Sequence, residues 1–307
     1  MINPVVHELT SPALVELPDY AVLDATGSDA QSFLKGQFCN DLAEATSNRA
    51  QLSGYCNPKG RLLALFTVFA IDEGYRLVLH RDLLDPTSKR LQMFVMRADV
   101  KIVARNDLLC SGVILPKADS FDIERPDIPA LPQVMDVKTN EVGNWVRTGE
   151  VQTLFIAGAD AQQTLLNAGT DIADVNAWRL QKIQAGIPSL FAATVEQFVP
   201  QMINLQQAGG LSFTHGCYPG QEIVARMQYL GKLKRQMLRF TLAGDDAPPA
   251  GAPITTADDT EVGVVIDAVA TDEGVQLLAV MKIANVDEAL MMAGQPLSKQ
   301  TLPYDEP

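Results

Sequence analysis

Long hydrophobic runs are absent from this sequence of 307 residues, and positively charged residues are in the minority. The longest apolar stretches, such as 62–70, are far shorter than the roughly 20 residues that a membrane-spanning helix needs. The chain carries 24 lysine and arginine residues against 37 aspartate and glutamate residues, a net charge of −13. Because nucleic-acid-binding domains usually present a strongly basic surface, this balance argues against direct nucleic-acid binding.

Cysteine is also scarce. The four cysteines, Cys39, Cys56, Cys110 and Cys217, lie far apart and form no C-x-x-C pair. This spacing indicates neither a zinc site nor a disulfide framework. The sequence has no P-loop and no G-x-G-x-x-G after a predicted strand, and residues 1–8 do not look like a secretory signal. We therefore expect no resident metal, no membrane partner and a location in the reducing cytoplasm.

The length and the pattern along the chain predict more than one domain. A chain of 307 residues exceeds the usual size of a single hydrophobic core. Strands and helices alternate to about residue 240, and a segment rich in proline and glycine, 244–253, follows. Residues 261–270 and 274–283 then form a predicted hairpin. The sequence therefore predicts an α+β body over 1–240 and a small β-barrel over 241–307.

Within the body, turn residues and apolar periodicity predict the individual elements. A strand at 20–27 leads to a helix that Ser28 could cap. An acidic, proline-rich segment at 119–133 is expected to be an exposed connection. The remaining expected elements are a hairpin of 61–71 and 75–80, helices at 82–97, 160–169 and 174–184, and short strands at 100–105, 111–115, 145–147 and 153–157.

The segment 213–222 (Phe-Thr-His-Gly-Cys-Tyr-Pro-Gly-Gln-Glu) is the most informative part of the chain. Its cysteine, Cys217, precedes a Pro-Gly turn and a helix predicted to run from Glu222 through Arg226. Unpaired N–H groups and the helix dipole at such a position favour the reactive thiolate. The alternative is that Cys217 is a small buried hydrophobic residue, as many lone cysteines are. Basic residues follow: Arg226, Lys232, Lys234, Arg235 and Arg239.

Residues 198–226 as a whole closely resemble the signature of the YgfZ family of folate-binding proteins, which is built around K-G-C-Y-x-G-Q-E. That family is related to the aminomethyltransferase (T-protein) of the glycine cleavage system. The resemblance implies an α+β fold of two interleaved lobes around a central folate cleft, followed by a C-terminal β-barrel. One departure is His215, where the family usually has lysine. It weakens the permanent positive charge beside the thiol and creates a possible Cys–His pair.

The resemblance also implies a cofactor, tetrahydrofolate or another reduced folate, and residues that would bind it. Trp178 matches a tryptophan that lines the folate cleft in the family, although a core position is the alternative. Tyr20 stands where the family has a second tryptophan, and it can still stack on a ring. Asn204 and Gln206 lie in the near-identical stretch, where their amides could contact the pterin edge or bond to the backbone.

What the resemblance implies about function is an accessory role. The protein would bind tetrahydrofolate and support the assembly or repair of iron–sulfur enzymes, including those that modify tRNA. Cys217 would be its functional thiol, with Glu222 and Arg226 beside it. Its partners would be iron–sulfur enzymes or assembly factors, and tRNA-modifying enzymes among them. The basic stretch 226–239 could dock a partner protein or RNA, or be a solvated strand edge.

Two other functions stay open at this point. The chain could be a folate-dependent aminomethyltransferase or demethylase that transfers one-carbon units to tetrahydrofolate on the same fold. That chemistry needs a carboxylate to position the amine, and a cysteine signature is not an obvious requirement of it. A tRNA-binding factor is the third hypothesis. The negative charge and the lack of interleaved basic and aromatic residues argue against it.

Overall fold

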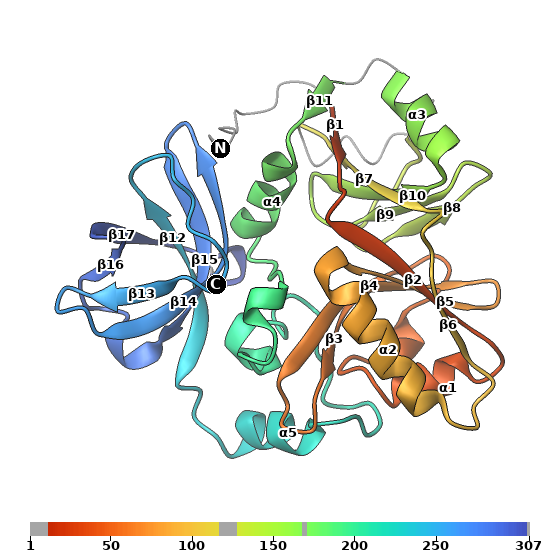
Figure 1. Cartoon of the computed structure of the whole chain (residues 1–307), viewed down its shortest axis with the longest axis horizontal. Coiled ribbons are helices and arrows are strands. Elements are labelled where there is room, and N and C mark those ends of the chain that lie inside the picture. Colours follow the sequence, from red (N-terminus) through yellow and green to blue (C-terminus); the bar gives the residue numbers. More distant parts are fainter. Residues whose placement is uncertain (1–11, 117–127, 168–170, 306–307) are drawn as a thin grey trace.

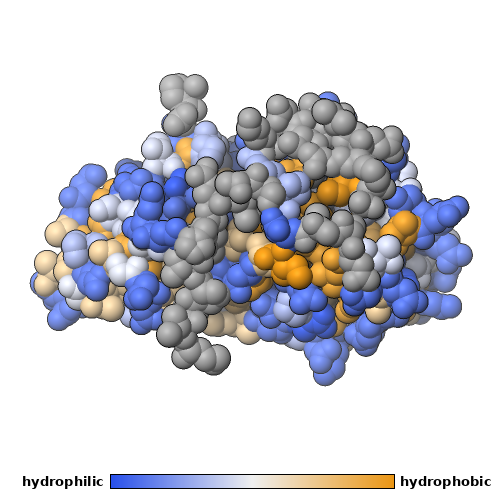
Figure 2. All heavy atoms as spheres, turned by 90° about the horizontal axis from the view of Figure 1, so that it is seen from above, coloured by the Kyte–Doolittle hydropathy of each residue, from blue (hydrophilic) through white to orange (hydrophobic). Residues whose placement is uncertain are grey.

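The computed structural model describes residues 12–116, 128–167 and 171–305, and most of the expected connection 119–133 lies outside them. The described chain forms two β-sheets, flanked by helices, and a separate β-barrel (Figure 1). Among the described residues, no helix is both long enough and apolar enough to cross a bilayer. Figure 2 shows a face that is mostly hydrophilic, with hydrophobic residues gathered in patches on its right half.

The first sheet has five strands in the order β3-β4-β5-β2-β6. Its strands are β2 (Tyr20–Thr26), β3 (Gln51–Cys56), β4 (Leu62–Ile71), β5 (Gly74–His80) and β6 (Lys101–Ala104). The predicted hairpin is present as β4 and β5, and helix α2 (Leu84–Val95) follows it. Helix α1 (Ala30–Lys35) has Asp29 at its N-cap, so the expected cap at Ser28 is wrong by one residue. The Ser28 hydroxyl donates to Asp99 Oδ2 instead, at 2.9 Å.

The second sheet has six strands in the order β11-β1-β7-β10-β9-β8. The chain enters it first with β1, leaves to build the five-stranded sheet, and returns with β7. This crossing confirms the expected interleaving of two α+β lobes. The strands are β1 (Ala13–Glu16), β7 (Leu109–Ile114), β8 (Val137–Thr139), β9 (Asn144–Arg147), β10 (Gln152–Ala157) and β11 (Asp171–Ala173), with helix α3 (Ala159–Asn167) between the last two.

A buried polar network joins the two sheets. Asp24 in β2 accepts two hydrogen bonds from Arg76 in β5, at 2.8 and 2.7 Å, and a third from Arg105 at 2.7 Å. Arg76 also donates to the side chain of Asn144 in β9 of the other sheet. Asp24 and Arg76 are both buried. Because a buried charge must be paired and hydrogen-bonded, this network fixes how the lobes meet.

The C-terminal part is a closed barrel, as expected. Its strand order is β12-β15-β14-β13-β16-β17, and β17 pairs back with β12. The expected boundary between residues 240 and 241 falls inside β12, so the barrel begins at Arg235 instead. The strands are β12 (Arg235–Leu242), β13 (Pro253–Thr256), β14 (Glu261–Thr271), β15 (Gly274–Lys282), β16 (Leu290–Met292) and β17 (Gln295–Gln300).

Two helices carry three of the sequence-predicted site residues: Trp178 lies on α4, and Glu222 and Arg226 lie on α5. Helix α4 (Val175–Gln184) begins where the Asp174 side chain accepts a hydrogen bond from the Asn176 N–H, and it ends before Gly186, whose φ is +67°. Helix α5 (Gln221–Tyr229) begins after Gly220, one residue before the expected start at Glu222. Gly220 has a φ of +83°, which favours glycine. In Figure 1, α4 lies between the barrel and the sheets, whereas α5 lies at the lower end of the molecule.

Candidate functional site

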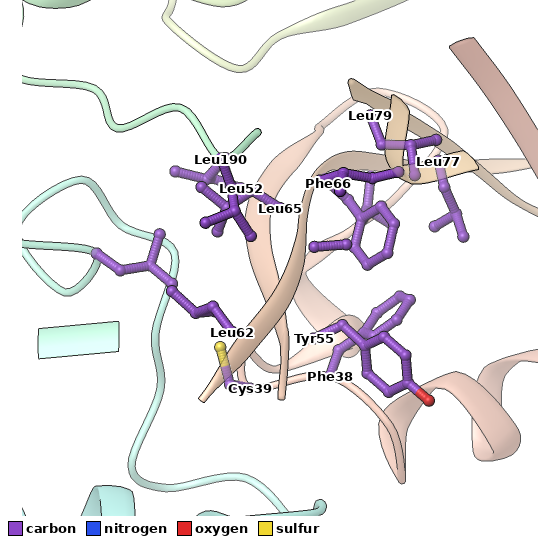
Figure 3. Packing of buried hydrophobic residues seen from close by; sticks show 14 of the residues in the cluster. Phe38, Cys39, Leu52, Tyr55, Leu62, Leu65, Phe66, Leu77, Leu79 and Leu190 are labelled. Atoms are coloured by element: carbon purple, nitrogen blue, oxygen red, sulfur yellow. The ribbon is translucent and has the colours of Figure 1, made fainter. Parts of the chain in front are cut away.

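A cavity of about 450 Å³ lies where the five-stranded sheet, α4 and the barrel meet. This volume is within the usual range for small-molecule sites. Its floor is apolar and comes from side chains of β3, β4 and β5 together with Leu190. Figure 3 shows four of these, Leu52, Leu65, Leu79 and Leu190, in the buried cluster that also contains Phe66. Non-polar walls of this kind suit a flat organic ring system.

Three aromatic rings form one side of this cavity: Tyr20, His80 and Phe191. The His80 and Phe191 rings meet edge to face, with centroids 4.7 Å apart, and the Tyr20 and His80 centroids are 6.4 Å apart. The His80 ring is oriented by Asp82, because its Nδ1 lies 2.6 Å from Asp82 Oδ1. The wall therefore presents an ordered aromatic surface on which a ligand ring can stack.

Helix α4 supplies the cations of the cavity. Arg179 and Lys182 are three residues apart, so they share one face of the helix, and both line the cavity. Arg179 is paired with Asp267 of β14, which also lines the cavity. Lys182 Nζ donates to Ser189 Oγ at 2.9 Å and to Tyr20 Oη at 3.4 Å. Within the described residues Lys182 forms no ion pair, so its charge is available to an anionic group of a ligand.

Tyr20 and Trp178 lie together, but only Tyr20 reaches the cavity. The Trp178 indole N–H donates to Tyr20 Oη at 3.2 Å. Trp178 itself is buried and packs against Gly112 of β7, where an added Cβ would lie 2.4 Å from the indole. Trp178 is therefore in the core, the alternative that the sequence left open, and it is not among the residues that line this cavity. Its ring fills the space beside Gly112 of the six-stranded sheet, and its indole N–H holds the hydroxyl group of Tyr20.

Replacing Gly112 with alanine is expected to push the Trp178 indole out of its place. The new methyl group would overlap the ring, and overpacking of this kind costs about 1–3 kcal/mol. We expect urea unfolding, followed by circular dichroism, to show a loss of that size. Gly158→Ala is the control, because the nearest atom to an added Cβ there is 4.0 Å away. An equal loss in both variants would contradict this account of Trp178.

Asn204 and Gln206 do not line this cavity. The Asn204 side chain is buried and donates to the Met237 carbonyl at 2.9 Å and to Tyr304 Oη at 3.0 Å. It therefore joins the body to the barrel. Gln206 is exposed. Contact of these amides with a pterin edge stays a prediction, whereas for Asn204 the alternative of a bond to the backbone is confirmed.

Cys217 is exposed, in contrast to Cys39, Cys56 and Cys110, which are buried. Its neighbours hold the loop: Tyr218 is buried and stacks on His215, with ring centroids 5.2 Å apart. His215 Nε2 lies 3.0 Å from the Phe38 carbonyl oxygen. The thiol is therefore presented to solvent by an anchored loop. Cys217 is not among the residues that line the 450 Å³ cavity.

Glu222 and Arg226 are exposed on α5 and form no ion pair within the described part of the chain. The basic stretch after them does not form one surface. Arg239 lies on β12 of the barrel, and its Nη2 donates to Oε1 of Gln276 on the neighbouring strand β15 at 3.0 Å. Burial lowers the pKa of its guanidinium. Lys234 and Arg235 line a second depression instead. No group of three or more metal-binding side chains is found among the residues described.

The sequence reasoning missed four of the residues that line the cavity: His80, Lys182, Phe191 and Asp267. Asp267 had a signal, because it is a charged residue inside an apolar run of β14, whose other charge, Glu261, lies at the first position of the strand. Lys182 also had a signal, because it lies one helical turn after Trp178 and therefore on the same part of the predicted helix. His80 and Phe191 follow no pattern that distinguishes them from ordinary core residues.

Comparison with known proteins is consistent with this arrangement. No family model matches the chain. A protein of Klebsiella pneumoniae (strain 342), named tRNA-modifying protein YgfZ, is 30% identical over 280 residues, which cover 87% of this chain and 84% of that protein. A protein of the same name from Aliivibrio fischeri (strain MJ11) is 27% identical over 304 residues, 97% of this chain and 94% of its own.

Among solved structures, the glycine cleavage system aminomethyltransferase T from Bartonella henselae superposes with a TM-score of 0.78. The match covers 97% of this chain and 87% of that structure, at 16% sequence identity. At this identity the likeness shows a shared fold and nothing more. It confirms the expected architecture of interleaved lobes with a C-terminal barrel.

Proposed function

Because the chain belongs to the YgfZ family, we propose that it is a tetrahydrofolate-binding accessory protein of the cytoplasm. In this role it supports the assembly or repair of iron–sulfur clusters and, through the enzymes that depend on them, tRNA modification. Its relatives carry the name tRNA-modifying protein. Cys217 is the functional thiol, and iron–sulfur enzymes or assembly factors are the partners.

The observation that carries the proposal is the cavity beside Tyr20. A reduced folate has a flat pterin, a second ring and a glutamate tail that is negatively charged. The aromatic side formed by Tyr20, His80 and Phe191 offers stacking surface for a ring. Lys182, which has no carboxylate partner within the described residues, offers a charge for the tail. Both requirements of the ligand are met within one cavity.

Replacing Tyr20 with alanine is expected to weaken tetrahydrofolate binding about tenfold. The substitution removes a stacking ring, whose loss costs on the order of 1 kcal/mol or more. Calorimetric titration of the purified protein with tetrahydrofolate measures the change. Tyr229→Ala is the matched control, because Tyr229 is an exposed tyrosine of α5 outside the cavity. No binding heat with the unmodified protein would remove folate from the proposal.

The thiol is tested separately from the ligand. Cys217→Ser is introduced into cells that lack the protein, and the activities of iron–sulfur enzymes are compared with those in cells given the unmodified chain. We expect the serine variant to fail. Gln228→Ala, an exposed change on the same helix, is expected to succeed. Full restoration by Cys217→Ser would overturn the thiol role and leave folate binding untouched.

A specific observation favours a second function, that of a folate-dependent aminomethyltransferase or demethylase. This chemistry needs a carboxylate near the ligand, and Asp267 lines the cavity. Only its Oδ1 bonds to Arg179; its Oδ2 has no hydrogen-bond partner among the described residues. One-carbon transfer to tetrahydrofolate by the purified protein, lost in Asp267→Asn, would support the enzyme over the accessory role.

A further inference from the structure

A second depression, of about 830 Å³, lies outside the proposed folate cavity and shares no lining residue with it. Four parts of the chain form it: the 57–61 turn, α2, the segment 196–202 and the start of β12. It is lined by five cationic side chains, Lys59, Arg61, Arg90, Lys234 and Arg235. In a chain with a net charge of −13, this is a local concentration of positive charge.

These cations are not neutralised by the protein. Within the described residues none of the five forms an ion pair with a carboxylate. The single acid of the lining is Glu196, and its Oε1 accepts a hydrogen bond from Asn57 Nδ2 at 2.8 Å. Like charges held close together repel one another, so this cluster lowers the stability of the folded protein. A bound anion would reduce the repulsion.

The depression is built on a rigid turn. Asn57 Oδ1 accepts hydrogen bonds from the N–H groups of Lys59 and Arg61, at 2.8 and 3.0 Å. The Arg61 guanidinium is itself held, because its Nη1 donates to the Gln197 carbonyl at 2.6 Å. The guanidinium of the half-buried Arg90 is also held, because its Cζ lies 5.7 Å from the centroid of the Phe94 ring. The cationic groups are therefore partly oriented before any ligand arrives.

The lining also limits what the ligand can be. It contains no aromatic side chain, so it offers no surface on which a nucleobase or another flat ring could stack. Its apolar contribution comes from Pro58 and Met202. Three of its five cations are arginines, whose planar forks match phosphate oxygens. The ligand must therefore be recognised through closely spaced negative charge.

We propose that this depression binds a small anion with two or more adjacent phosphate groups. The anion lies between the 57–61 turn and the start of β12, and the arginine and lysine side chains contact its phosphate oxygens. The volume suits a small molecule. The absence of stacking surface in the lining disfavours single-stranded RNA as the occupant. The inference does not depend on folate binding, because the two lining sets are separate.

Inorganic triphosphate is the probe, titrated calorimetrically into the full-length protein at low ionic strength. We expect saturable binding that weakens as salt is added. The double variant K59E/K234E, which reverses two exposed lysines of the lining, is expected to bind at least about tenfold more weakly. The matched control K101E/K299E makes the same charge change at exposed lysines outside the depression and is expected to bind as the unmodified protein does.

Three results would overturn the proposal. They are no binding of triphosphate by the unmodified protein, an equal loss in both double variants, and tight binding of an RNA oligonucleotide that triphosphate does not displace. Circular dichroism and thermal unfolding of both variants show that they are folded. Retained tetrahydrofolate binding in K59E/K234E distinguishes a failure here from a failure of the proposed function.

Discussion

Substitution of Cys217 by serine is expected to remove nearly all of the fast reaction of the folded protein with an aromatic disulfide reagent. Cys217 is exposed, whereas the other three thiols are buried. Burial raises the pKa of Cys110 to about 12. A hydrogen bond with Cys39, together with burial, raises the pKa of Cys56 well above its usual value. Buried thiols react only after the fold opens, so we expect them to be slower by a factor on the order of 10³ or more.

The measurement is the release of the coloured leaving group with time. The folded protein should release about one equivalent rapidly, and the unfolded protein should release the equivalents of all four cysteines. Cys110→Ser serves as the control, because it removes a slow thiol and should leave the fast phase intact. A fast phase that persists in Cys217→Ser, or that includes two thiols in the unmodified protein, would contradict the assignment.

Replacing Asp24 with alanine is expected to lower the free energy of unfolding by about 3–5 kcal/mol. The substitution leaves the guanidinium of Arg76 buried, with one of its two partners gone. It also removes the hydrogen bond from Arg105. Because the network bridges both sheets, the loss should affect the whole body and not one lobe. Urea unfolding followed by circular dichroism measures it.

Asp107→Ala is the matched control for this change. Asp107 pairs with the other side of Arg105 at 2.6 Å, but its side chain is 63% exposed. Exposed ion pairs contribute at most about 1 kcal/mol, so we expect a small effect. The double variant D24L/R76M removes both buried charges and should recover part of the lost stability. A loss of less than about 1 kcal/mol in Asp24→Ala would show that the network does not hold the lobes together.

The sequence predicted the local elements well because their signals are local. The hairpin of β4 and β5 and that of β14 and β15 each combine apolar strands with a polar turn that contains glycine. The interleaving could not be read from such signals. It depends on pairing between distant strands, as between Leu14 and Val113, and only the family resemblance implied it. The predicted cap at Ser28 was wrong for the same reason, because the Ser28 hydroxyl donates to Asp99 in a distant segment.

The candidate site was predicted in part. Tyr20 lines the cavity, as the resemblance implied. For Trp178 a cleft position and a core position were both open, and the packing against Gly112 of the six-stranded sheet, which places it in the core, gives no signal in the sequence around Trp178. For Asn204 a pterin contact and a backbone bond were both open, and its partners could not be predicted because Met237 and Tyr304 come from the C-terminal part of the chain. When the partners of a residue are distant in the chain, the sequence around that residue gives no signal of where its side chain packs.

The pairing of Arg179 with Asp267 ties α4 to the barrel across a wall of the cavity. Since the sheet, the helix and the barrel each supply part of that wall, the cavity exists only while all three are docked. A bound ligand therefore stabilises the docked arrangement. Each tenfold rise in its concentration above the dissociation constant raises the free energy needed to separate the barrel from the body by about 1.4 kcal/mol. Resistance of the 243–252 connection to a protease should consequently rise with occupancy.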